Sequence, residues 1–231
     1  MLAFIIVSLA IINAMREIYL DNAATTPCDP QVVKVMKPYW SEICGNPSSF
    51  NDAGWKAKKA LDEARNKIAR ILGAKNQEVI FTSSATEANN LAIFGTTKIR
   101  GGKCKVITTE IEHHSVLEPI KKIKERGAEI LYLSVKKDGL IKLDELKKAL
   151  TPDTVLISII YANNEIGSVQ PIKKIAKIIK EFKIAVPLDT PEGSNLKLKI
   201  HEKTPFFHVD ASQAAAHLDI NVNNLGVDLM T

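Results

Sequence analysis

Cysteine is scarce in this sequence: only Cys28, Cys44 and Cys104 occur among 231 residues. An odd, low number without paired spacing argues against a disulfide framework and fits a reducing compartment. No C-x-x-C pair is present either, so we expect no metal site. Cys104 precedes an apolar, strand-like run and is predicted to be structural. These absences favour a cytoplasmic protein.

Signatures of nucleic-acid binding are missing as well. The sequence has no RNP motif, zinc knuckle or helix-turn-helix pattern, and it shows no internal repeat or low-complexity tract. The net charge is +5, but the lysines are spread along predicted helices and are expected to face solvent. With 45% hydrophobic and 25% charged residues, the composition is that of a globular protein. We therefore expect no nucleic-acid partner.

A membrane-spanning run is not found in the sequence. Residues 1–14 are almost wholly apolar, but the run is shorter than the ~20 residues that a spanning helix needs. It is similar to the apolar core of a signal peptide, yet it lacks the basic residues that precede such a core. Since Met15 would be a natural start, we interpret residues 1–14 as an apolar N-terminal extension. An export signal is the alternative, and we expect no membrane association.

Helical and strand-like segments alternate after Met15. Asp29 and Pro30 are typical of a helix start, and Gly73 is typical of a helix end. Strands that alternate with helices of this length predict an α/β fold, a mostly parallel sheet flanked by helices. The predicted helices span residues 30–40, 54–72, 86–97, 115–126, 143–150 and 172–182, and the predicted strands span residues 78–82, 105–109, 129–133, 154–161, a segment from Phe206 and residues 228–231.

Residues 185–204 break this alternation. They contain a Pro-Glu-Gly-Ser-Asn turn followed by the alternating run Leu196-Lys-Leu-Lys-Ile200. A turn beside alternating residues is typical of a β-hairpin. Because a βα unit needs only a short loop at this point, we predict that the segment is a hairpin-like insertion.

Two polar clusters follow predicted strands and precede predicted helices. Residues 83–90 open a helix, where small side chains and the Thr86 hydroxyl would let backbone N–H groups approach a phosphate. A plain Ser/Thr cap is the alternative there. His113 would stack on a ring or move a proton near neutral pH, or it is a surface or cap histidine. We expect His113 and His114 to point to opposite faces, so that they do not converge on a metal.

Two further clusters carry amides and an acid. Asn163 and Asn164 lie in a loop closed by Gly167, where they would bind a polar ring substituent or serve as turn residues. Asp210 ends the strand from Phe206, and a buried carboxylate there needs a partner such as a protonated ring nitrogen. A parallel sheet gathers the carboxyl ends of its strands at one edge. The four clusters together fit pyridoxal 5'-phosphate, whose pyridinium nitrogen pairs with an acid.

Five segments occur in a fixed order: YLDNAATTP at 19–27, GNPSS at 45–49, FTSSATE at 81–87, NNEIG at 163–167 and HVDASQ at 208–213. Together they resemble the cysteine desulfurases of the NifS/IscS type. These enzymes belong to the class V aminotransferase group of fold-type I pyridoxal-phosphate enzymes. The resemblance extends from about residue 19 to residue 231, apart from the predicted insertion.

The resemblance implies roles for six residues around pyridoxal 5'-phosphate. Ala85 and Thr86 would bind the cofactor phosphate. His113 would stack on the pyridine ring and assist proton transfer, which makes it the candidate catalytic residue. Asn164 and Gln213 would hydrogen-bond near the ring hydroxyl, and Asp210 would pair with the ring nitrogen.

The implied reaction takes sulfur from L-cysteine and leaves alanine. The sulfur would pass as a persulfide to an acceptor or scaffold protein for iron–sulfur cluster or thio-cofactor assembly, and members of the family are homodimers. Another class V aminotransferase or a selenocysteine lyase is the alternative, although NNEIG at 163–167 favours a desulfurase.

The resemblance also implies residues that this sequence lacks. In the family, Asp-Leu-Met-Ser/Thr leads to Ser-x-His-Lys, whose lysine holds the cofactor covalently, whereas here the sequence ends at Thr231. A mobile-loop cysteine and a substrate-binding arginine are also missing. We therefore expect residues 15–231 to be the N-terminal portion of the cofactor-binding domain, without the small C-terminal domain. The chain alone would be inactive, and a non-catalytic or split-enzyme fragment that needs a partner chain is a further alternative.

Overall fold

Two units make up the part of the chain that the computed structural model describes, namely residues 18–98, 104–185 and 205–231. The first unit ends at Glu42 and contains α2 (Pro30–Met36) and α3 (Pro38–Ser41). The Asp29 carboxylate caps α2 by accepting the Gln31 N–H at 2.7 Å. We predicted one helix over residues 30–40, which is wrong, because Pro38 has no N–H and begins a second short helix.

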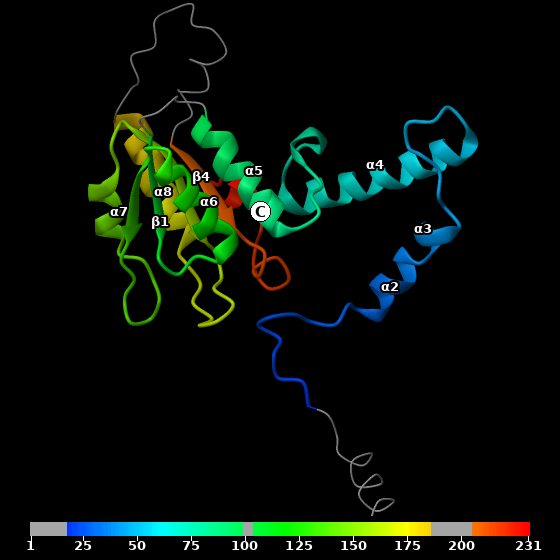
Figure 1. The fold of residues 1–231 in the computed structure, drawn as a ribbon, viewed down its shortest axis with the longest axis horizontal. Helices are drawn as coiled ribbons and strands as arrows, with labels where there is room; N and C mark the ends of the chain where they lie inside the picture. Colours follow the sequence, from blue (N-terminus) through cyan, green and yellow to red (C-terminus); the bar gives the residue numbers. More distant parts are fainter. Residues whose placement is uncertain (1–17, 99–103, 186–204) are drawn as a thin grey trace, which may run out of the picture. The chain divides into compact units, whose positions relative to one another are not determined.

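A sheet forms the centre of the second unit (Figure 1). Its strand order is β2-β1-β3-β4-β5. All four pairings are parallel, so the predicted α/β fold with a parallel sheet is confirmed. At the carboxyl ends, Thr109 pairs with Leu133 and Ile160 pairs with Asp210. The strands are β1 (Lys105–Thr109), β2 (Glu129–Leu133), β3 (Thr154–Ile160), β4 (Phe206–Asp210) and β5 (Leu229–Met230).

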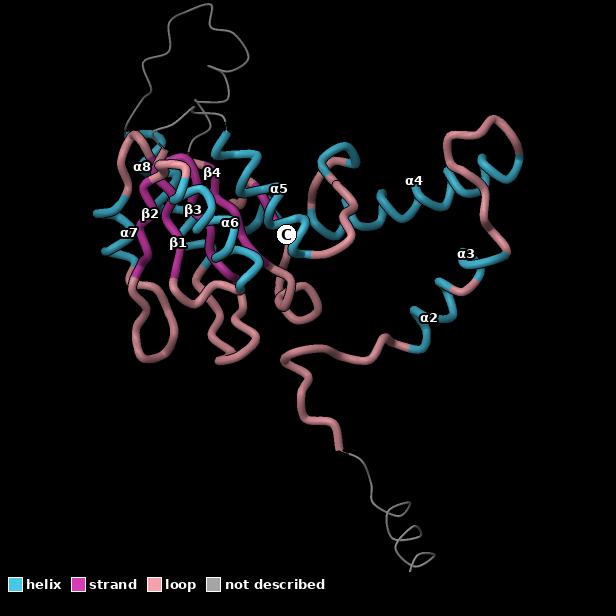
Figure 2. The backbone as a smooth tube through the Cα atoms, viewed as in Figure 1, coloured by secondary structure: helices cyan, strands magenta, loops and turns pink. Residues whose placement is uncertain are grey.

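Helices pack against both faces of this sheet, and Figure 2 draws the helices in cyan and the strands in magenta. On one face, Ile93 of α5 and Ile120 of α6 pack with Val106 of β1. On the other face, Leu146 of α7 and Ile175 of α8 join a larger core. Every residue of β3 is buried, as expected for a parallel strand covered on both faces. The helices are α5 (Ala85–Thr97), α6 (His114–Glu125), α7 (Leu143–Ala149) and α8 (Ile172–Ala185).

The segment before α5 differs from our prediction. The helix α4 (Asp52–Leu72) ends at Gly73, whose φ of 68° favours glycine, as predicted. The predicted strand at residues 78–82 is wrong: a short 3-10 helix, η1 (Asn76–Glu78), leads into an irregular segment. A strand needs a neighbour, and these residues pair with no strand in the part of the chain that the structure describes. The Arg65 guanidinium donates to the Val79 carbonyl instead.

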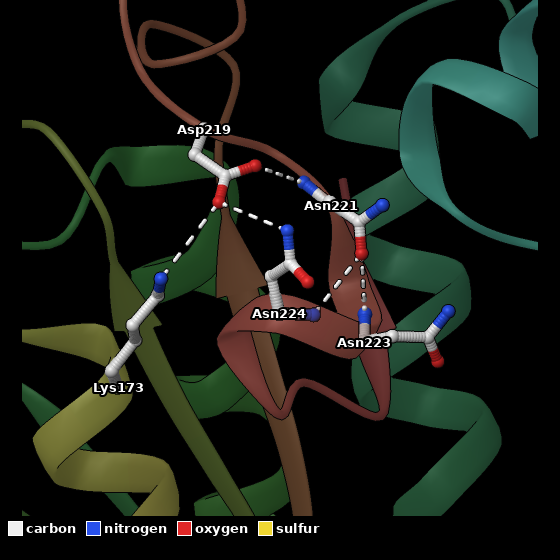
Figure 3. A network of polar contacts seen from close by, with 5 residues as sticks. All are labelled: Lys173, Asp219, Asn221, Asn223 and Asn224. Carbon is white, nitrogen blue, oxygen red and sulfur yellow. Dashed lines mark hydrogen bonds and ion pairs between the residues drawn. The ribbon is translucent and has the colours of Figure 1, made fainter.

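A network of local polar contacts precedes the short helix α10 (Val222–Leu225). Figure 3 shows Asp219 and Asn221 at its centre, with Lys173 nearby. The Asn221 side chain accepts the backbone N–H groups of Asn223 at 3.1 Å and Asn224 at 3.0 Å. It therefore caps the helix in the usual way for asparagine.

Two predicted segments lie outside the described residues. The apolar extension at residues 1–14 is one of them, and the hairpin-like insertion is the other, apart from residue 185, which ends α8. Within the described ranges, no helix combines the length and the apolar character needed to cross a bilayer.

Candidate functional site

The strand order places a topological switch point between β1 and β3. The chain leaves β1 toward β2 on one side of the sheet, and then returns to β3 and β4 on the other. Ligands of open parallel sheets bind outside the carboxyl ends of the strands at such a point. His113 follows β1, Asn163 and Asn164 follow β3, and Asp210 ends β4. Three of the four predicted clusters therefore lie along the same edge.

Asp210 is buried at this edge, with only 4% of its surface exposed. Its Oδ2 accepts a hydrogen bond from Asn89 Nδ2 at 2.9 Å. Its Oδ1 accepts the Ser212 N–H at 3.1 Å and the Ser212 hydroxyl at 2.7 Å. A carboxylate has about four lone-pair positions, so these three donors leave one position for a cationic partner. This arrangement suits a protonated ring nitrogen.

His113 begins α6 and is tied to Ser115. Its Nδ1 lies 3.1 Å from the Ser115 backbone nitrogen and 2.7 Å from the Ser115 hydroxyl oxygen. The imidazole itself is exposed, so its other nitrogen is accessible to a ligand. We expected His113 and His114 to diverge, but their rings make an edge contact with centroids 6.3 Å apart. The reason is that these residues start a helix and do not continue the strand.

Ala85 and Thr86 lie exposed in the first turn of α5, a helix of 13 residues. The Ser84 hydroxyl caps the helix by accepting the Glu87 N–H at 3.2 Å. The Glu87 carboxylate in turn accepts the Ser83 hydroxyl at 2.6 Å and the Ser83 N–H at 2.7 Å, which lowers the pKa of Glu87. The cap that we considered as an alternative is thus present, and it leaves the helix start open to an anion.

The amides of the loop after β3 have different surroundings. Asn163 Nδ2 donates to the carbonyl of Ile111 at 2.9 Å, and its Oδ1 accepts the N–H groups of Glu165 and Ile166. Asn163 therefore joins this loop to the loop that carries His113. Asn164 is half-buried beside it. Gln213 is exposed in the turn after β4, three residues beyond Asp210.

Sequence reasoning missed Glu112, which holds the His113 loop against β3. Its side chain is 5% exposed, and its Oε1 accepts the Thr109 hydroxyl at 2.6 Å and the Ile160 N–H at 3.0 Å. Burial raises the pKa of Glu112 to about 8, and the charge of Asp210 adds to this effect. Its Oε2 is buried and has no hydrogen-bond partner among the described residues. An acid beside two histidines was visible in the sequence, but its partner lies 48 positions away.

Asn89 and His208 were missed as well. Asn89 is fully buried on α5, where it contacts Asp210, and nothing in its local sequence distinguishes it from Asn90. His208 is buried in β4, with Nδ1 at 2.8 Å from the Ser158 hydroxyl. Burial lowers the pKa of His208 to about 4, although the charge of Asp210 opposes the change. His208 is therefore neutral near pH 7.

Comparison with known proteins agrees with this geometry. The family model for aminotransferase class-V matches residues 18–195. The chain belongs to the class V aminotransferase family. Among curated class V relatives, the cysteine desulfurase IscS of Dictyoglomus turgidum is 46% identical, over 94% of this chain and 50% of that protein. The mitosomal cysteine desulfurase of Trachipleistophora hominis is 42% identical, over 96% of this chain and 47% of that protein.

Solved structures show the same class V fold. A NifS-like protein has a TM-score of 0.79 and 34% identity, covering 94% of this chain and 55% of that one. SspA in complex with cysteine has a TM-score of 0.75 and 36% identity, covering 90% of this chain and 55% of that one. The chain spans about half the length of the curated relatives it matches. The resemblance inferred from five short segments is thus confirmed at the level of the family.

Proposed function

We propose that this chain forms the pyridoxal 5'-phosphate-binding part of a cysteine desulfurase. The observation that carries the proposal is the buried Asp210 carboxylate at the end of β4, which retains one open lone-pair position. Relatives that match 94% or more of the chain are cysteine desulfurases, which supports this reaction over that of a selenocysteine lyase.

The donor set along the sheet edge fits this cofactor. Asp210 would pair with the ring nitrogen, and Ala85 and Thr86 at the start of α5 would hold the phosphate. His113 would lie on the ring and assist proton transfer there. Asn164 and Gln213 would hydrogen-bond near the ring hydroxyl. When bound, the cofactor supplies an electron sink for bonds at the Cα of an amino acid.

The proposed substrate is L-cysteine, which would lose its sulfur and leave alanine. The sulfur would pass to an acceptor or scaffold protein, and the intact enzyme would act as a homodimer. None of the three cysteines, which all lie in the described ranges, forms a disulfide, and this fits a reducing cytoplasm. Residues 1–231 include no match for the family's cofactor lysine or sulfur-accepting cysteine. We therefore propose that this chain binds the cofactor but does not turn over cysteine by itself.

Equilibrium dialysis with pyridoxal 5'-phosphate tests the proposal. The substitution Asp210→Asn should weaken binding about 10- to 100-fold, because it removes one hydrogen bond between charged groups. The matched control is Asp219→Asn, an exposed acid in the network of Figure 3, which should leave binding unchanged. No binding by the unmodified chain, or equal binding by both variants, would overturn the proposal. Sustained alanine release from cysteine would contradict the expected lack of turnover.

A further inference from the structure

A buried hydrogen-bond chain connects Asp210 to His113 through Asn89. The Asn89 side chain is 0% exposed, and its Nδ2 donates to Asp210 Oδ2 and to Ser115 Oγ, both at 2.9 Å. Its Oδ1 accepts the Thr231 hydroxyl at 2.5 Å. Because an ionised carboxylate can only accept, the nitrogen of the amide must face Asp210. Both amide protons of Asn89 are therefore committed within the protein.

The same chain fixes the position of a proton on His113. The backbone N–H of Ser115 donates to Nδ1 at 3.1 Å, so Nδ1 must carry a lone pair. The Ser115 hydroxyl, 2.7 Å from Nδ1, must then also donate to it. Since that oxygen accepts from Asn89, the donor of each hydrogen bond between Asp210 and the imidazole is fixed: Asn89 donates to Asp210 and to Ser115, and Ser115 donates to His113. Neutral His113 therefore carries its proton on Nε2, the nitrogen that is not bonded to Ser115.

We propose that Asn89 is a positioning residue, which holds the Asp210 carboxylate and, through the Ser115 hydroxyl, keeps His113 in the Nε2–H tautomer. The inference rests on the proposed function, because it concerns the two side chains that would contact the ring of the cofactor. Helix α5 would then contribute Asn89 as well as its exposed first turn. The Asn89 amide would position both the Asp210 carboxylate, which would pair with the ring nitrogen, and the His113 imidazole, which would stack on the ring.

The substitution Asn89→Asp separates this role from a merely structural one. The oxygen that replaces Nδ2 carries at most one proton, and this proton stays in the hydrogen bond to the charged Asp210 carboxylate. The lone pair facing Ser115 then attracts the serine hydroxyl away from His113. We expect the ratio of Nδ1–H to Nε2–H tautomers of His113 to rise about fivefold, the effect of one net hydrogen bond. Ser115→Ala removes the same hydroxyl and should give a similar change.

Long-range proton–nitrogen NMR spectra of the chain with labelled histidine report this tautomer without cofactor. The signal of His113, one of five histidines, is assigned with His113→Gln. The matched control is Asn224→Asp, an exposed amide 3.5 Å from Asp219, which should leave the tautomer unchanged. Backbone amide spectra of each variant establish that it folds. An unchanged tautomer in both Asn89→Asp and Ser115→Ala, or an Nδ1–H tautomer in the unmodified chain, overturns the inference.

A binding experiment distinguishes this inference from the proposed function. Asn89→Asp should weaken pyridoxal 5'-phosphate binding about tenfold while binding of inorganic phosphate, which needs only the start of α5, stays the same. If the unmodified chain does not bind pyridoxal 5'-phosphate, the proposed function fails even when the tautomer agrees. If it binds and Asn89→Asp binds equally well, only the positioning role is overturned.

Discussion

Two networks of aspartate and asparagine lie in the same unit and differ in where their partners come from. In the exposed network of Figure 3, Asp219 Oδ1 accepts the Asn221 N–H at 3.0 Å, and Asn224 lies five positions along the chain. In the buried network, Asn89 and Asp210 are 121 positions apart. Apart from the ion pair with Lys173 of α8, the first network forms within residues 219–224, whereas the second exists only when α5 and β4 are packed together.

This difference separates local capping from assembly of a site. The exposed Asp219 carboxylate is stabilised little by Lys173, 3.9 Å away, or by its asparagine partners, because water competes for these contacts. A buried acid must be paired, because loss of its donors leaves a charge without solvation. The buried network should therefore dominate both stability and ligand binding, and three variants test that ranking.

The largest expected effect is that of Asn89→Leu. This substitution leaves Asp210 Oδ2 and Ser115 Oγ without their donor, and we expect the free energy of unfolding to fall by about 2–4 kcal/mol. Urea unfolding followed by circular dichroism measures the change. The corresponding control in the exposed network, Asn224→Leu, should change stability by no more than about 0.5 kcal/mol. Similar losses in the two variants would contradict the comparison.

The second effect is a pH dependence that originates in Glu112. Its pKa in the folded chain is about 8, above the ordinary glutamate value of 4.5, so the folded state holds a proton that the unfolded state releases. The contribution of Glu112 to stability is therefore fully present below pH 4.5 and is lost as the pH rises through about 8. Between pH 6.5 and 8 we expect a loss of roughly 2 kcal/mol. The substitution Glu112→Gln, which mimics the neutral acid, should abolish it.

His208 provides an internal control for this pH experiment. Its pKa is lowered from 6.5 to about 4, so between these pH values His208 is protonated in the unfolded state and neutral in the folded state. Stability is lost as the pH falls from 6.5 toward 4, which is the opposite direction. Glu112→Gln should keep this acidic limb and lose only the alkaline one. A variant that retains the alkaline loss would show that Glu112 is not its source.

Local signals in the sequence were sufficient for most of the fold. Gly73 ends α4 through local contacts as predicted, and apolar runs identify the strands of the sheet, whereas the short helix α10 was not predicted. The error at residues 78–82 has the opposite origin, because an apolar run becomes a strand only beside another strand. Ile80 and Phe81 remain 67% and 44% exposed in this structure.

Of the candidate site, the sequence predicts where some residues lie. The positions of Asp210 and His113 at one edge of the sheet could be predicted because strand ends are recognisable and parallel strands share an edge. Asn89 and Glu112 could not, because their roles depend on partners 121 and 48 positions away. A buried amide and a surface amide have the same letter in the sequence. Packing alone decides which of them orients a neighbour, as it does for Asn89 and Asn224.

The smallest expected effect is that of Asp219→Asn. The side chains of Asp219 and Lys173 are 46% and 65% exposed, and their charged atoms are 3.9 Å apart, so the ion pair is screened by water. The amide keeps an oxygen that accepts the Asn221 N–H. We expect stability to change by at most about 0.5 kcal/mol in urea unfolding, with little dependence on salt. A loss as large as that of Asn89→Leu would mean that burial does not explain the difference between the two networks.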